Sequence, residues 1–120
     1  MRTVQTVLVS FDIDGTLESG DPPGPVAMAL VRRAKTLGYL VGSCSDRTLR
    51  EQAQMWAQHA IVADFVSLKH ELNALRRRIG EARFIHIGDS TVDEHYARLA
   101  GFEFWNVHQL PLEGADGWIF

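Results

Sequence analysis

The sequence is poor in the features that mark secreted and membrane proteins. Its single cysteine, Cys44, cannot form an internal disulfide, and a lone thiol fits a reducing cytosol. No stretch approaches the ~20 apolar residues that span a bilayer. The apolar run near the N-terminus is short and ends in aspartates, unlike a signal peptide. We therefore expect a soluble, cytoplasmic protein without a membrane partner.

The chain also lacks an excess of one charge. Twelve Lys and Arg residues face fifteen Asp and Glu residues, which gives a net charge of -3. This balance argues mildly against a generic nucleic-acid coat, although it leaves a local basic patch open. The five histidines show no metal-ligand spacing, so we expect them, His86 included, to be surface or core groups. Without repeats or a linker, residues 1–120 should form one domain with its own core.

Short apolar runs alternate along the chain with longer helical patterns. Strands are predicted at 4–11, 39–44, 62–68, 83–88 and 103–107, and helices at 25–38, 45–60, 69–80 and 90–101. Pro25 suits a first helical turn, and Ser45 or Asp46 suits the next N-cap. The alternation predicts an α/β fold, a single Rossmann-like parallel sheet with helices on both faces. The tail from His108 receives no assignment.

Polar residues follow the predicted strands. Asp12 and Asp14 end the first strand, Ser45 ends the second, Lys69 follows the third and Asp89 follows the fourth. In an open parallel sheet, ligands bind outside the carboxyl ends of the strands. We therefore expect these residues, distant in sequence, to meet at one edge of the sheet.

The residue types gathered there suit phosphoryl transfer. Three or four carboxylates without cysteine or histidine partners suit a hard cation, of which Mg²⁺ is the usual one. Lysine and the hydroxyl groups of Ser45 and Thr16 suit the oxygens of a phosphoryl group. An unprotonated aspartate beside the phosphorus can act as a nucleophile and form an aspartyl-phosphate.

Four segments resemble the motifs of the haloacid dehalogenase superfamily. FDIDGTL resembles its first motif, DxDGT after an apolar strand, and LVGSCSDR resembles the second. Lys69 in VSLKHEL resembles the third, and HIGDSTVDEHYARLAG the fourth, GDxxxD. The resemblance covers residues 6 to 107 with the motifs in the family's order. It implies a Rossmann-like hydrolase acting on phosphoric monoesters.

The resemblance also implies catalytic roles. Asp12 would be the nucleophile, and Asp14 the general acid and then the base, with a pKa that we expect crowding beside Asp12 to raise. Lys69 would stabilise charge on the nucleophile and the phosphoryl oxygens. Ser45 would hydrogen-bond the phosphoryl group. Ser43 is the alternative, but the stretch from Ser45 to Arg47 matches the family better.

A metal site follows from the same resemblance. Asp12 and Asp89 would bind Mg²⁺ through their carboxylates, and Asp14 through its backbone carbonyl. Asp93 would be either a ligand or a support for the ligands. Thr16 would help to shape the turn after the first strand.

The intervals between the motifs are too short for the cap domain that many relatives carry over the site. An open site favours a large phosphorylated substrate, such as a nucleic-acid end, a phosphoprotein or a glycan, or else a neighbouring subunit that acts as a lid. ESGDPPGP, residues 18–25, is expected to form a short flap beside it.

Two alternatives stay open. The first is a polynucleotide 3′-phosphatase, favoured by the capless core and a tryptophan-bearing helix after the second motif, and disfavoured by the acidic net charge. The second is a non-catalytic binding module. The intact Asp12, Asp14, Lys69 and Asp89 disfavour it, because a structural domain has little physical reason to gather this charge.

Overall fold

The apolar runs form one parallel sheet. The computed structural model describes residues 5–111 and 113–120, and over these ranges the sheet contains five strands. They are β1 Val7–Phe11, β2 Leu40–Ser45, β3 Phe65–Leu68, β4 Arg83–Gly88 and β5 Glu103–Asn106. Their order is β3-β2-β1-β4-β5, and every pairing is parallel. The predicted α/β class with a Rossmann-like sheet is confirmed.

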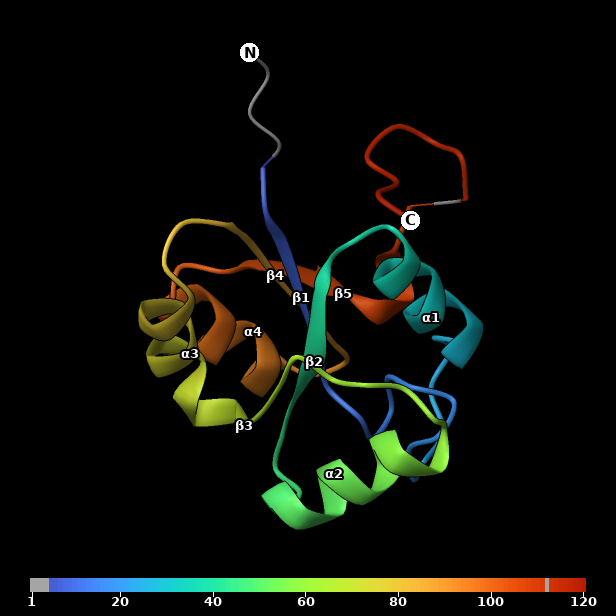
Figure 1. Cartoon of the computed structure of the whole chain (residues 1–120). Coiled ribbons are helices and arrows are strands. Elements are labelled where there is room, and N and C mark those ends of the chain that lie inside the picture. The colour runs from blue at the N-terminus through green and yellow to red at the C-terminus, as the bar shows by residue number, and fades with distance from the viewer. Residues whose placement is uncertain (1–4, 112) are drawn as a thin grey trace.

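Helices cover both faces of the sheet (Figure 1). The helices α1 (Met28–Thr36) and α2 (Leu49–Gln58) pack on one face, where Val31 and Trp56 join Val9 of β1 in a buried cluster. The helices α3 (Leu72–Ile79) and α4 (Thr91–Leu99) pack on the other, where a second cluster includes Leu8 of β1. Successive β1 residues point to opposite faces, so the central strand contributes buried apolar side chains to both sides of the sheet.

Three helices begin at least three residues later than predicted. The helix predicted from residue 69 starts as a 3-10 helix, and α3 itself begins at Leu72. Pro25 does not lie in the first turn of α1, because the adjacent Val26 pairs with Leu17 in a short parallel bridge and the N-cap is Ala27. The N-cap of α2 is Thr48, whose side chain accepts a hydrogen bond from the Glu51 backbone, whereas Ser45 is still within β2. The backbone pairing and a better-placed cap residue therefore override the local signals.

The remaining differences lie at strand ends and in the tail. β3 begins at Phe65 rather than at 62. The side chain of Asp64, just before it, accepts a hydrogen bond from the Val41 backbone at 2.8 Å, so a side chain takes the place of a strand pairing there. Val4, in the first predicted strand, lies outside the described residues. A 3-10 helix, η2 (Val107–Gln109), follows β5, and the tail then packs against α1, where Arg33 donates to the Phe120 carbonyl. Within the described ranges, no helix has the length and apolar character needed to cross a membrane.

Candidate active site

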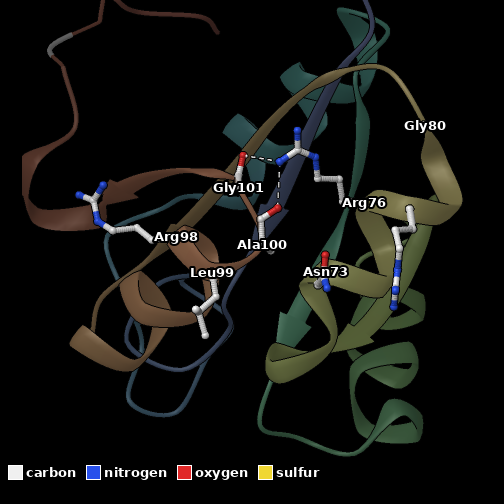
Figure 2. Close-up of a pocket in the computed structure, with 8 residues that line it drawn as sticks. Asn73, Arg76, Gly80, Arg98, Leu99, Ala100 and Gly101 are labelled. Atoms are coloured by element: carbon white, nitrogen blue, oxygen red, sulfur yellow. Dashed lines mark hydrogen bonds between the residues drawn. The ribbon is translucent and has the colours of Figure 1, made fainter.

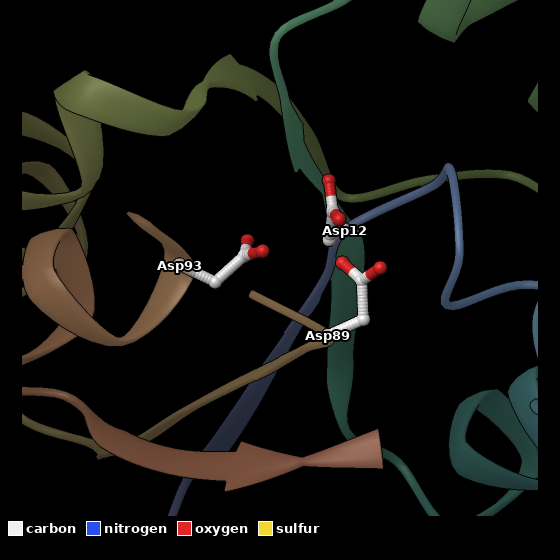
Figure 3. A group of neighbouring side chains, drawn as sticks. All are labelled: Asp12, Asp89 and Asp93. Atoms are coloured by element: carbon white, nitrogen blue, oxygen red, sulfur yellow. The ribbon is translucent and has the colours of Figure 1, made fainter. Parts of the chain in front are cut away.

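Three carboxylates meet at the carboxyl edge of the sheet (Figure 3). Asp12 follows β1 and Asp89 follows β4, and these strands are neighbours, joined beyond β1 by a 2.9 Å hydrogen bond from the Asp12 backbone to the Ile87 carbonyl. Asp93 reaches the same place from the first turn of α4 and is fully buried. One oxygen from each carboxylate lies within 4.8 Å of the others.

Two glycines leave the space that these carboxylates occupy. A Cβ atom at Gly15, whose φ is +74°, would lie 2.0 Å from Asp89 Oδ2. A Cβ atom at Gly88 would lie 2.5 Å from Asp93 Cγ. Because no side chain fits at either position, the glycines of DIDGT and HIGD are steric requirements of the acidic cluster.

Lys69 supplies the positive charge among these carboxylates. It opens a 3-10 helix, η1 (Lys69–Glu71), directly after β3, and is 5% exposed. Its Nζ lies 3.4 Å from Asp12 Oδ1, 3.2 Å from Asp93 Oδ1 and 3.5 Å from Asp46 Oδ2. Burial alone would lower the pKa of Lys69, but these three carboxylates outweigh it and raise the pKa above its usual value. The ammonium therefore stays charged.

Burial acts differently on Asp12 and Asp93. It raises the pKa of Asp12 to about 7, and the nearby negative charge of Asp93 adds to this effect. It would raise the pKa of Asp93 too, but hydrogen bonds from His86 and Ser90, with the charge of Lys69, lower that pKa to about 2. Asp93 is thus ionised, whereas Asp12 gives up its proton near neutrality.

Asp14 lies outside the acidic cluster. Its Oδ1 is 2.6 Å from Arg47 Nη2, its Oδ2 is 3.1 Å from Arg47 Nε, and the Asp21 backbone also donates to it. The hydrogen bonds from Arg47 lower the pKa of Asp14. The prediction that crowding beside Asp12 raises this pKa is wrong, because the side chain of Asp14 lies against a guanidinium rather than against the other carboxylates.

The loop at residues 18–25 is hydrogen-bonded to the turn that follows Asp14. Gly15 donates its backbone N–H to Pro22, Thr16 accepts one from Val26, and Gly24 lies so close to the Thr16 backbone that a Cβ atom would overlap it. Thr16 Oγ1 is the buried side-chain polar atom that lacks a partner within the described ranges. The expected flap at 18–25 is therefore a closed loop that fixes the turn.

Two serines on β2 occupy different environments. Ser43 Oγ donates to Gln52 Oε1 at 2.7 Å and accepts from Trp56 Nε1 at 2.9 Å, so its hydroxyl is fully used in joining β2 to α2. Ser45 Oγ accepts from the Arg47 backbone at 3.1 Å and donates to no partner within the described part of the chain. The geometry favours Ser45 as the hydroxyl available to a ligand.

The donor set suits a small hard cation. Carboxylate oxygens without sulfur or nitrogen donors are typical Mg²⁺ ligands, and opposite ligands of Mg²⁺ lie about 4 Å apart, close to the spacing of this cluster. Asp93 Oδ1 already binds His86 and Lys69, and its Oδ2 accepts from Ser90 at 2.7 Å. Asp12 and Asp89 are therefore the better direct ligands, and Asp93 the support.

Sequence reasoning missed His86. It is fully buried in β4, with Nδ1 2.9 Å from Ser10 Oγ and Nε2 2.8 Å from Asp93 Oδ1. The sequence did carry a signal for its position. Side chains alternate along a strand, so His86 lies on the same face of β4 as Gly88, the face covered by α4.

The larger hollows of the surface lie elsewhere. One of about 550 Å³ opens between the C-terminal ends of α3 and α4 (Figure 2). Of its arginines, Arg76 donates to the carbonyls of Ala100 and Gly101, and Arg98 pairs with Glu94. A smaller hollow of about 270 Å³ is lined in part by Asp89, a member of the acidic cluster.

Known proteins offer no assignment for this site. No family model, curated protein or solved structure matches the chain. The function must therefore follow from the chemistry of the residues themselves.

Proposed function

We propose that this protein is a Mg²⁺-dependent phosphohydrolase that cleaves phosphomonoesters through an aspartyl-phosphate on Asp12, as a capless member of the haloacid dehalogenase superfamily. The observation that carries the proposal is the buried ammonium of Lys69 between Asp12 and Asp93, with Asp89 beside them. Gathering three carboxylates at one buried edge is costly unless cations compensate them. The ammonium of Lys69 is one such cation, and a Mg²⁺ ion bound by the carboxylates would be the second.

Asp12 and Asp89 would hold the Mg²⁺ ion, with the backbone carbonyl of Asp14 as the third ligand that the family resemblance implies. When bound, the ion neutralises charge that develops on the phosphoryl oxygens. Lys69 and Ser45 would bind the same phosphoryl oxygens from the ends of the neighbouring strands β3 and β2. Asp93, ionised and hydrogen-bonded on both oxygens, keeps Lys69 in place.

The reaction then takes two steps. An oxygen of Asp12 forms a bond to phosphorus while the ester P–O bond breaks, and the leaving oxygen takes a proton from Asp14. Water next attacks the phosphorus, gives a proton to Asp14, and the bond to Asp12 breaks to release phosphate. The low pKa that Arg47 imposes on Asp14 keeps its carboxylate ionised, as the base of the second step must be, whereas transfer of the proton in either direction requires this ion pair to loosen.

Hydrolysis of p-nitrophenyl phosphate tests the proposal. The rate should depend on Mg²⁺, and Asp12→Asn should lower it by at least about 10³-fold, because the nucleophile is removed. Asp46→Asn is the matched control, since it removes an exposed carboxylate that also lies near Lys69. Equal rates for the wild type and Asp12→Asn would refute the nucleophile.

A polynucleotide 3′-phosphatase is the second candidate. The hollow beside Asp89 favours it, because Phe104, Asn106 and Gln109 line it and offer stacking and amide contacts to a base. The buried Trp56 no longer supports it, since its indole binds Ser43 inside the core. Phosphate release from 3′-phosphorylated oligonucleotides, compared with sugar phosphates, separates the two; equal rates would count against an oligonucleotide substrate.

A binding-only module predicts a different result. Beryllofluoride mimics an aspartyl-phosphate, so Mg²⁺-dependent binding to the wild type but not to Asp12→Asn would exclude it.

A further inference from the structure

A series of polar contacts runs from the interior of the sheet to the candidate nucleophile, through Ser10, His86, Asp93, Lys69 and Asp12. We call this series the hydrogen-bond line. Ser10 and His86 are register partners on β1 and β4, and their side chains meet at 2.9 Å. His86 Nε2 lies 2.8 Å from Asp93 Oδ1, Lys69 Nζ lies 3.2 Å from the same oxygen, and Lys69 Nζ lies 3.4 Å from Asp12 Oδ1. Ser10, His86 and Asp93 are fully buried.

The contact with Asp93 assigns a proton to one nitrogen of His86. The Asp93 carboxylate is ionised and can only accept, so Nε2 of the imidazole carries a proton and donates it. Nδ1 on the other side of the ring lies within hydrogen-bond distance of the Ser10 hydroxyl, which can either donate or accept. The ring is thus fixed from both sides by groups of the sheet and α4.

Asp93 depends on this ring for its orientation. Its carboxylate lies over Gly88, in space that a Cβ atom would fill, and the hydroxyl of Ser90 holds the second oxygen. Without His86, Lys69 alone would hold Oδ1. Lys69 has a competing partner in Asp46, whose exposed carboxylate lies 3.5 Å from the ammonium.

We propose that His86 is a positioning residue: by donating from Nε2 it fixes Asp93, and Asp93 in turn keeps the ammonium of Lys69 against Asp12. Its catalytic consequence rests on the proposed function. The imidazole itself touches neither substrate nor metal, and it acts through a hydrogen bond to a carboxylate, as residues behind a metal site commonly do.

Long-range ¹⁵N NMR of histidine-labelled protein tests the hydrogen-bond line without any substrate. The expected spectrum shows a protonated Nε2 on His86. Ser10→Ala should change the Nδ1 signal, because it removes the hydrogen-bond partner of that nitrogen. An unprotonated Nε2, or no response to Ser10→Ala, would overturn the proposed line.

Kinetics test what the line does. His86→Leu removes the donor and should lower kcat for p-nitrophenyl phosphate by about 10- to 100-fold. His86→Gln keeps an N–H donor and should restore most of that loss. Phe84→Leu is the structural control, because it trims a buried side chain of the same strand face, and it should keep kcat despite a similar loss of thermal stability.

The outcomes separate this inference from the proposed function. A His86→Leu effect no larger than that of Phe84→Leu, or no rescue by His86→Gln, overturns the positioning role while phosphatase activity stands. A wild type that hydrolyses no phosphomonoester refutes the proposed function instead. In that case the proton on Nε2 of His86 and the response of Nδ1 to Ser10→Ala decide the hydrogen-bond line alone.

Discussion

Replacing Asp12 with asparagine should stabilise the metal-free fold at neutral and alkaline pH. Burial and the charge of Asp93 raise the pKa of Asp12 from 3.8 to about 7, so ionisation of this carboxyl opposes folding. Its protonation stabilises the folded state fully below the unfolded pKa, and this contribution is lost as the pH rises through about 7. Asparagine carries no charge to lose.

The magnitude follows from the width of that window. From about pH 5 to about pH 7 the folded carboxyl holds a proton that the unfolded carboxyl has already released, and each pH unit is worth about 1.4 kcal/mol. Between pH 5 and pH 8 the wild type should therefore lose about 3 kcal/mol of unfolding free energy through Asp12 alone. Asp12→Asn should not lose it, and groups common to both proteins cancel in the comparison.

Urea unfolding in EDTA at the two pH values measures this difference. Asp46→Asn is the control, because it removes a carboxylate equally close to Lys69 but exposed to solvent, and it should follow the wild type. Identical pH dependence for the wild type and Asp12→Asn would refute the electrostatic account of the site. Mg²⁺ added at pH 8 should stabilise the wild type by about 3 kcal/mol at 100 times its Kd, and Asp12→Asn much less.

Four further substitutions probe the geometry around the nucleophile. Gly88→Ala should displace the carboxylate above it, which costs about 1–3 kcal/mol in urea unfolding and weakens Mg²⁺ binding in calorimetry; unchanged binding would contradict the steric role of the glycine. Ser43→Ala should cost about 1–3 kcal/mol of stability with little change in kcat, whereas Ser45→Ala should do the reverse, and a swapped result would reassign the ligand hydroxyl. Arg47→Met should raise the pKa of Asp14 towards its ordinary value, as a ¹³C carboxyl titration would show, and an unmoved titration would contradict the ion pair as its cause.

The fold was largely predictable because apolar residues recur at different spacings in its strands and in its helices. The apolar strand around Val41 and the capped helix that begins after Ser90 need no tertiary information. The start of α1 was not predictable, because the pairing of Val26 with Leu17 depends on how the loop folds back. The local signal of Pro25 is real but weaker than that pairing.

The sequence predicted which residues form the candidate site, but not which of their pKa values is raised. Strand ends bring Asp12, Lys69 and Asp89 together, so topology alone places them at one edge. The raised pKa belongs to Asp12 rather than to Asp14, because an arginine from the β2–α2 connection reaches only the second of them. The sequence shows which residues share an edge of the sheet but not which way a loop side chain turns.

The closed loop after Asp14 has a consequence for binding kinetics. Because Pro22 and Val26 are hydrogen-bonded to the backbone of the turn at Gly15 and Thr16, the wall of the site is assembled before any ligand arrives. Capture then requires no gate to open or shut. Association should be a single-step encounter limited by diffusion, and dissociation should be limited by the contacts alone rather than by the movement of the loop.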